Sequence, residues 1–140
     1  MKELTLPANI DQLDTVLEFV EGILDTTDCP IDVRMHIQIA VEEIFVNIAH
    51  YAYTPSEGEA TIRCSVSHEP PAVTIQFRDH GVPYNPLLRE DPDITLTAEQ
   101  RSIGGLGIFM VKKSMDEVQY QYADGQNIFT IVKYLESKEA

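Results

Sequence analysis

A carboxylate and a carboxamide stand four residues apart in a segment whose apolar spacing predicts a helix over residues 31–50: Glu43 and Asn47. Side chains at positions i and i+4 share one face of a helix. The apolar stripe of this segment lies about a quarter turn away, so the pair is expected at the margin of the core. There, a carboxylate can act as a general base and a carboxamide as a metal ligand. Taken alone, the pair is more simply explained as an ordinary polar pair on a helix surface.

A second carboxylate, Asp79, ends an apolar strand and begins the turn-rich segment of residues 79–86. A carboxylate held at a strand end can accept a hydrogen bond from the exocyclic amine of a base. Aspartate at such a position also forms turns without any ligand, and in isolation this is the simpler interpretation.

Three glycines, at 104, 105 and 107, surround Leu106 and precede an apolar segment expected to be helical to about Met115. Glycines before a helix let backbone N–H groups approach a phosphate, and a helix N-terminus favours an anion. The spacing matches neither the P-loop nor the dinucleotide-binding pattern. A loop-to-helix junction without a ligand remains the alternative.

The charge balance excludes several classes of function. The chain has 140 residues, 10 lysines and arginines and 23 aspartates and glutamates, giving a net charge of −13. Such a charge argues against sequence-independent nucleic-acid binding and against docking on an anionic membrane. No apolar run reaches the roughly 18 residues of a membrane span, and two cysteines are too few for a disulfide scaffold. We therefore expect a single domain over residues 1–140, located in the cytoplasm.

The elements that would position these residues alternate between strand and helix patterns. The chain begins with a short strand (3–6) and a helix to about residue 25, for which Asn9 and Gln12 resemble a capping box. After the helix at 31–50, alternation predicts a hairpin of strands near 60–66 and 73–77. A long segment without a period, residues 87–103, is typical of a lid or binding loop. A helix and two closing strands, near 117–123 and 127–135, complete an α+β sandwich with a mainly antiparallel mixed sheet and helices on one face.

The order of these signals is more specific than any one of them. Together they resemble the pattern of the GHKL ATP-binding superfamily, which is named for gyrase, Hsp90, histidine kinases and MutL. The resemblance rests on Glu43-x-x-x-Asn47, Asp79-x-Gly81, the Gly104–Gly107 run and a closing strand with Thr130. Within this superfamily the chain is most similar to the small anti-sigma regulatory factors, which are serine/threonine protein kinases. The resemblance covers nearly the whole chain and implies the Bergerat ATP-binding fold, with residues 87–103 as the ATP lid.

The resemblance implies a role for each matching residue. Glu43 would be the catalytic base and Asn47 the Mg²⁺ ligand. Asp79 would bind the adenine amine with support from Thr130, and Gly81 would let the backbone pass close to the base. The remaining residues would contact the phosphates: Arg101, Gly104, Gly105, Leu106 and Gly107.

Two positions depart from the family pattern. Tyr51 stands four residues after Asn47, where the family often has histidine. Ser102 and Ile103 separate Arg101 from Gly104, whereas many kinases of this group have a compact Arg-x-Gly-x-Gly run. ATP binding is still expected with tyrosine at position 51. The second departure concerns the contact of Arg101 with the γ-phosphate.

The resemblance implies a kinase that uses ATP and Mg²⁺ to phosphorylate a partner protein, with a STAS-domain anti-sigma factor antagonist as the expected substrate. It also implies a sigma factor as a second partner and a homodimer. Two alternatives stay open at this stage. One is a non-catalytic module that grips a protein when ATP is bound, and the other is a slow ATPase.

Overall fold

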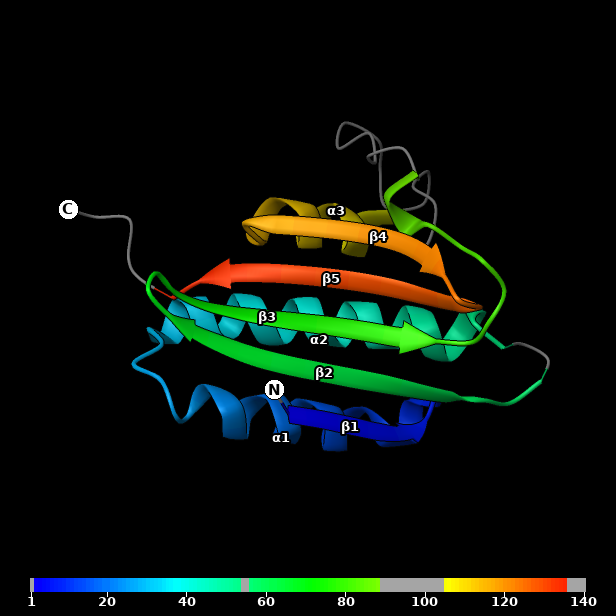
Figure 1. The fold of residues 1–140 in the computed structure, drawn as a ribbon, viewed down its shortest axis with the longest axis horizontal. Coiled ribbons are helices and arrows are strands. Elements are labelled where there is room, and N and C mark those ends of the chain that lie inside the picture. Colours follow the sequence, from blue (N-terminus) through cyan, green and yellow to red (C-terminus); the bar gives the residue numbers. More distant parts are fainter. Residues whose placement is uncertain (1, 54–55, 89–104, 136–140) are drawn as a thin grey trace.

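Five strands and three α-helices make up the part of the chain described by the computed structural model, which is residues 2–53, 56–88 and 105–135 (Figure 1). In chain order these are β1 (Lys2–Pro7), α1 (Leu13–Leu24), α2 (Ile31–Tyr51), β2 (Glu59–His68), β3 (Pro71–Asp79), α3 (Gly105–Ser114), β4 (Glu117–Ala123) and β5 (Gln126–Tyr134). Two short 3-10 helices, Ile10–Gln12 and Pro86–Leu88, complete the set. The elements follow the predicted order.

The strands form one sheet in the order β1-β2-β3-β5-β4, in which every neighbouring pair is antiparallel. The three helices cover one face of this sheet, and none of the described helices lies on the other face (Figure 1). The α+β class and the single helical face are therefore confirmed. The prediction of a capping box at Asn9 and Gln12 is wrong, because the Asn9 side chain makes no cap hydrogen bond. The chain instead enters α1 through the 3-10 helix Ile10–Gln12.

Alternation along the strands explains why one face is covered. Val73, Ile75 and Phe77 on β3 are almost fully buried and point to the helices, whereas the residues between them are part-exposed. Successive side chains of a strand point to opposite faces, so this pattern gives the sheet an apolar inner face and a polar outer face. Ile37, Val41 and Ile44 of α2 pack against the inner face, as the predicted stripe requires.

A tight turn sets the register of the last hairpin. Asp124 and Gly125 join β4 to β5, and both have positive φ angles, 54° and 75°. Two such residues form the turn whose twist matches that of antiparallel strands. The turn pairs Ala123 with Gln126 and, one step further, Tyr122 with Asn127. It therefore fixes which residues of β4 lie beside the beginning of β5.

Candidate functional site

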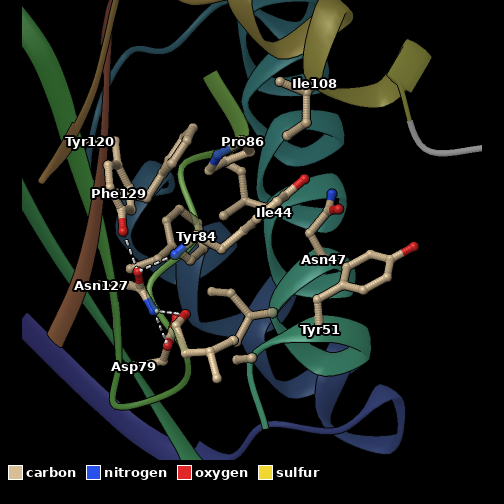
Figure 2. A pocket seen from close by; sticks show the side chains of 14 residues that line it. Ile44, Asn47, Tyr51, Asp79, Tyr84, Pro86, Ile108, Tyr120, Asn127 and Phe129 are labelled. Atoms are coloured by element: carbon tan, nitrogen blue, oxygen red, sulfur yellow. Dashed lines mark hydrogen bonds between the residues drawn. The ribbon is translucent and has the colours of Figure 1, made fainter. Parts of the chain in front are cut away.

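A pocket opens between the second half of α2 and the inner face of the sheet (Figure 2). Its walls are mainly apolar and include Ile44 from α2, Phe77 from β3, Ile108 from α3 and Phe129 from β5. A few polar groups converge on this apolar surface: Asn47, Asp79, Tyr120 and Asn127. A concave apolar site with a small number of placed polar groups is typical of small-molecule binding sites.

Asp79 lies at the inner end of the pocket and is only 5% exposed. Its Oδ1 accepts hydrogen bonds from the backbone N–H of Gly81 (2.9 Å) and from Asn127 Nδ2 (2.9 Å). Both of its hydrogen bonds among the described residues end on the same oxygen. Oδ2 is therefore the atom that can accept a hydrogen bond from a ligand in the pocket.

Asn127 holds Asp79 in place and was not among the residues predicted from the sequence. Its Nδ2 donates to Asp79 Oδ1 and to the carbonyl of Val82 (2.9 Å). Its Oδ1 accepts from the Tyr84 N–H (3.1 Å) and from the Tyr120 hydroxyl, as Figure 2 shows. Burial raises the pKa of that hydroxyl, which keeps it a proton donor. All four hydrogen-bonding positions of the carboxamide are thus used, and its orientation is fixed.

The expectation for Thr130 needs correction. Asp79 pairs with Asn127 across the strands, and Thr130 is three residues further along β5. An odd separation along a strand places two side chains on opposite faces of the sheet. Thr130 accordingly lies on the outer face, where Gln76 Nε2 contacts its Oγ1 at 3.3 Å. Asn127, not Thr130, is the β5 residue that supports Asp79.

Gly81 lets the chain leaving β3 cross the end of α2. A Cβ at this position would lie 2.1 Å from the carbonyl oxygen of Ala52, a distance that no side chain could occupy. The next residue, Val82, donates its N–H to the same carbonyl at 3.0 Å. The close approach predicted for Gly81 is therefore to the protein's own backbone, at the rim of the pocket.

Glu43 and Asn47 form a linked pair on α2. Asn47 Nδ2 donates to the backbone carbonyl of Glu43 (2.8 Å) and to its Oε1 (3.1 Å). Because Nδ2 makes both hydrogen bonds described for this side chain, Oδ1 is the atom that can bind a metal ion. Among the described residues, no group of three or more His, Cys, Asp or Glu side chains is arranged to hold a metal.

Gly107 brings the first turn of α3 against the same pair. A Cβ on Gly107 would lie 1.9 Å from both the Glu43 carboxyl carbon and its Oε1. Gly105 is the first residue of α3, and Leu106 follows it. Arg101, Gly104 and most of the expected lid, residues 89–103, lie outside the described residues. The structure thus places Gly107, one of the predicted phosphate-loop glycines, directly against Glu43, the predicted base.

Tyr51 and Tyr84 also line the pocket. Their ring centroids are 6.5 Å apart, and the rings are tilted by 40°. Tyr51 comes from α2, one turn beyond Asn47, and Tyr84 from the segment after β3 (Figure 2). Residue 51, where the family often has histidine, therefore supplies an aromatic ring.

Neither cysteine is suited to be a nucleophile. Burial raises the pKa of the Cys64 thiol to about 12, and desolvation also raises the pKa of Cys29. A nucleophilic cysteine needs a lowered pKa, because the thiolate is the reactive form.

Comparison with known proteins shows the family of this chain. The model of the histidine kinase-like ATPase domain matches residues 6–133. The chain belongs to this family. Its relatives include the serine-protein kinase RsbW of Listeria monocytogenes, which is 26% identical over 97% of this chain and 88% of the relative. RsbW of Bacillus mycoides is 23% identical over 98% of this chain and 86% of the relative. The resemblance to GHKL proteins and anti-sigma kinases is therefore confirmed.

Solved structures of other proteins share this fold. The crystal structure of the RsbU and RsbW domains of Rv1364c from Mycobacterium tuberculosis superposes on 96% of this chain and 33% of that chain, with a TM-score of 0.64 and 14% identity. The histidine kinase domain of a blue-light activated kinase from Erythrobacter litoralis gives a TM-score of 0.55 with 15% identity, covering 89% of this chain and 60% of that chain. Within the described part of the chain, no helix is long and apolar enough to cross a membrane.

Replacing Asn127 with alanine should weaken both the fold and nucleotide binding. The change would remove the hydrogen bonds that Asn127 makes to the buried Asp79 carboxylate and to the Tyr120 hydroxyl, at about 1–3 kcal/mol for each group that stays buried and unsatisfied. Urea denaturation would measure the free energy of unfolding, and calorimetry would measure ATP binding. Thr130→Ala is the matched control on the other face of β5 and should change ATP affinity less than twofold. A loss of ATP affinity in Thr130→Ala, with Asn127→Ala unaffected, would contradict the assignment.

Proposed function

We propose that this protein is an ATP- and Mg²⁺-dependent serine/threonine kinase that phosphorylates a regulatory partner protein. The observation that carries the proposal is the position of Glu43 and Asn47, one turn apart on α2, beside a pocket that ends at Asp79. The name of the RsbW relatives, serine-protein kinase, supports the same activity. Membership of the ATPase family supports ATP as the nucleotide.

Adenine is the base that suits the inner end of the pocket. Asp79 Oδ2 can accept a hydrogen bond from the exocyclic amine, and the apolar walls from Ile44, Phe77 and Phe129 fit the faces of a purine ring. Asn127 acts as the positioning residue, because it fixes the Asp79 carboxylate from behind. The glycines at 104, 105 and 107 and Arg101 are proposed to meet the phosphates, at the end of the pocket near Glu43.

Phosphoryl transfer requires an activated hydroxyl and neutralised phosphate charge more than covalent chemistry by the protein. We assign Glu43 as the base that takes the proton from the serine or threonine hydroxyl of the partner. The hydroxyl oxygen forms a bond to the γ-phosphorus, the bond to the β-phosphate oxygen breaks, and ADP leaves. Asn47 Oδ1 would hold Mg²⁺, which would supply positive charge at the phosphates.

The proposed substrate is a STAS-domain anti-sigma factor antagonist, and a sigma factor is the proposed second partner of a cytoplasmic homodimer. A single-turnover assay with γ-labelled ATP and a STAS-domain protein of the same organism tests the kinase activity. Label on the partner supports transfer, and free phosphate without the partner would indicate a slow ATPase. ATP binding with neither product would indicate a nucleotide-gated binding module and would overturn the kinase proposal.

Replacing Asn47 with alanine should remove the Mg²⁺-dependent part of ATP affinity. The loss follows because the variant lacks the carboxamide oxygen that we assign to the metal. ATP titrations with Mg²⁺ and with EDTA should differ in the unmodified protein and coincide in the variant. Gln119→Ala removes an exposed carboxamide from β4 and is the control. If Asn47→Ala kept the full Mg²⁺ dependence, the metal assignment would be wrong.

A further inference from the structure

An exposed row of large apolar side chains runs along the first half of α2. Ile31, Met35 and Ile39 are 78%, 59% and 53% exposed. They are spaced four residues apart, so they lie in one row on the helix surface, which we call the apolar ridge. At about 1.5 Å per residue the ridge is roughly 12 Å long, or a little over two helical turns. Contiguous exposed apolar side chains of this kind mark interaction sites more often than single exposed ones.

A row of carboxylates on α1 flanks the apolar ridge. Asp14, Glu18, Glu21 and Asp25, which we call the acidic row, follow one another at helical spacing along one side of α1 and its C-cap residue. Arg34, the residue before Met35, forms ion pairs with Glu21 and with Asp25 (2.6 Å). These contacts place Glu21 and Asp25, the C-terminal half of the acidic row, beside α2 and next to the ridge.

Gln38 links the same two helices one turn further on. Its Nε2 donates to Glu21 Oε2 at 2.8 Å and to the Leu17 carbonyl at 3.0 Å. Because Arg34 precedes Met35 and Gln38 precedes Ile39, Glu21 lies beside the ridge along the turn from Met35 to Ile39. The two surfaces therefore form one continuous face of the helix layer.

This face carries a strong negative charge. The acidic row and Asp32 supply five carboxylates, and the arginine between the two helices, Arg34, is already held by two of them. Asp14 and Glu18 are exposed, as is Asp32 beside Ile31. A second copy of the chain would bring acidic row against acidic row, and an anionic lipid surface would be repelled in the same way.

We propose that the apolar ridge and the acidic row together bind a cationic amphipathic helix of a partner protein. Apolar side chains at helical spacing on the partner would pack between Ile31, Met35 and Ile39, as in other helix-on-helix interfaces. Lysines or arginines beside them would meet Asp14 and Glu18. The complementary charge would speed association and make the affinity depend on salt. The proposed surface lies outside the nucleotide pocket and needs no nucleotide.

The test uses the nucleotide-free protein and two labelled synthetic helical peptides. Both peptides carry leucines at i, i+4 and i+8; one has flanking lysines and the other has glutamates in their place. Fluorescence anisotropy should show binding of the lysine peptide that is at least tenfold tighter than that of the glutamate peptide. The double variant Met35→Ser, Ile39→Ser should bind the lysine peptide at least tenfold more weakly. Tyr122→Ser, at a 47% exposed site on β4, should change it less than twofold.

A second pair of variants tests the charge. The double variant Asp14→Asn, Glu18→Gln should bind the lysine peptide at least threefold more weakly, and its affinity should depend less on salt. The control Glu69→Gln, Glu117→Gln changes two exposed carboxylates elsewhere and should have neither effect. Equal effects of the two pairs would show attraction to net charge alone and would overturn the proposal. Unchanged affinity in the ridge variant would also overturn it. So would sedimentation showing a dimer that the ridge variant breaks, since the occupant would then be a second copy.

Discussion

Glu43→Gln should bind ATP nearly as well as the unmodified protein and transfer its phosphate about 10²–10⁴ times more slowly, the range for a lost general base. Glutamine keeps the size of the side chain and an oxygen that can accept the Asn47 hydrogen bond, so α2 and the pocket stay intact. It cannot take a proton from the attacking hydroxyl. The measurement is a single-turnover transfer of labelled phosphate at saturating ATP, with calorimetry for nucleotide affinity.

Glu42→Gln is the matched control for this variant, because it makes the same chemical change at the neighbouring, exposed position of α2. It should transfer phosphate at the unmodified rate. If Glu43→Gln did so as well, Glu43 would not be the base, and the binding-module alternative would gain support. If both variants were equally slow, the effect would come from the charge of α2 and not from a proton transfer.

Asp79→Asn should weaken the binding of ATP and of ADP by roughly 1.5–3 kcal/mol, the range for a hydrogen bond to a charged group. The carboxamide oxygen of this variant can keep the hydrogen bonds from Gly81 and Asn127, which leaves the new NH₂ group facing the adenine amine. Two hydrogen-bond donors, the new NH₂ group and the adenine amine, would then face each other. GTP, which presents a carbonyl at the same ring position, should lose less affinity than ATP or should gain.

Calorimetric titration of ATP, ADP and GTP into both proteins measures this change in preference. Asp14→Asn makes the same change at an exposed site on α1 and should leave all three affinities within twofold. Equal affinity of the unmodified protein for ATP and GTP would refute adenine recognition by Asp79, whatever the variant does.

Local patterns in the sequence were sufficient to predict most of the fold. The alternation of Val73, Ile75 and Phe77 and the helical spacing of Ile37, Val41 and Ile44 each reflect a single element with one buried side. Such periodicities need no knowledge of what the element packs against. The spacing of Glu43 and Asn47 likewise follows from one helix, which is why their proximity was predictable.

The partner of Asp79 could not be predicted in this way. Asn127 lies 48 residues further along the chain, and the two meet only because β3 pairs with β5 in one particular register. Sequence spacing within a strand does show that Asn127 and Thr130 point to opposite faces. It does not show which of those faces carries the pocket. The family pattern points to Thr130, but the register puts its side chain on the face opposite the pocket.

The Asp124–Gly125 turn also aligns β4 with the residues that we propose for base recognition. Its two residues do not line the pocket, yet their positive φ angles determine the pairing of Tyr122 with Asn127 and the place of Tyr120 beside it. A slip of one residue would exchange inner for outer side chains along β4, the edge strand, and would turn the Tyr120 hydroxyl away from Asn127, which β3 holds in register with Asp79. Insertions or deletions in this short connection would therefore remove one of the hydrogen bonds that fix Asn127, although no altered residue would line the pocket. The length of this turn is thus a means of changing the support of Asp79 from outside the pocket.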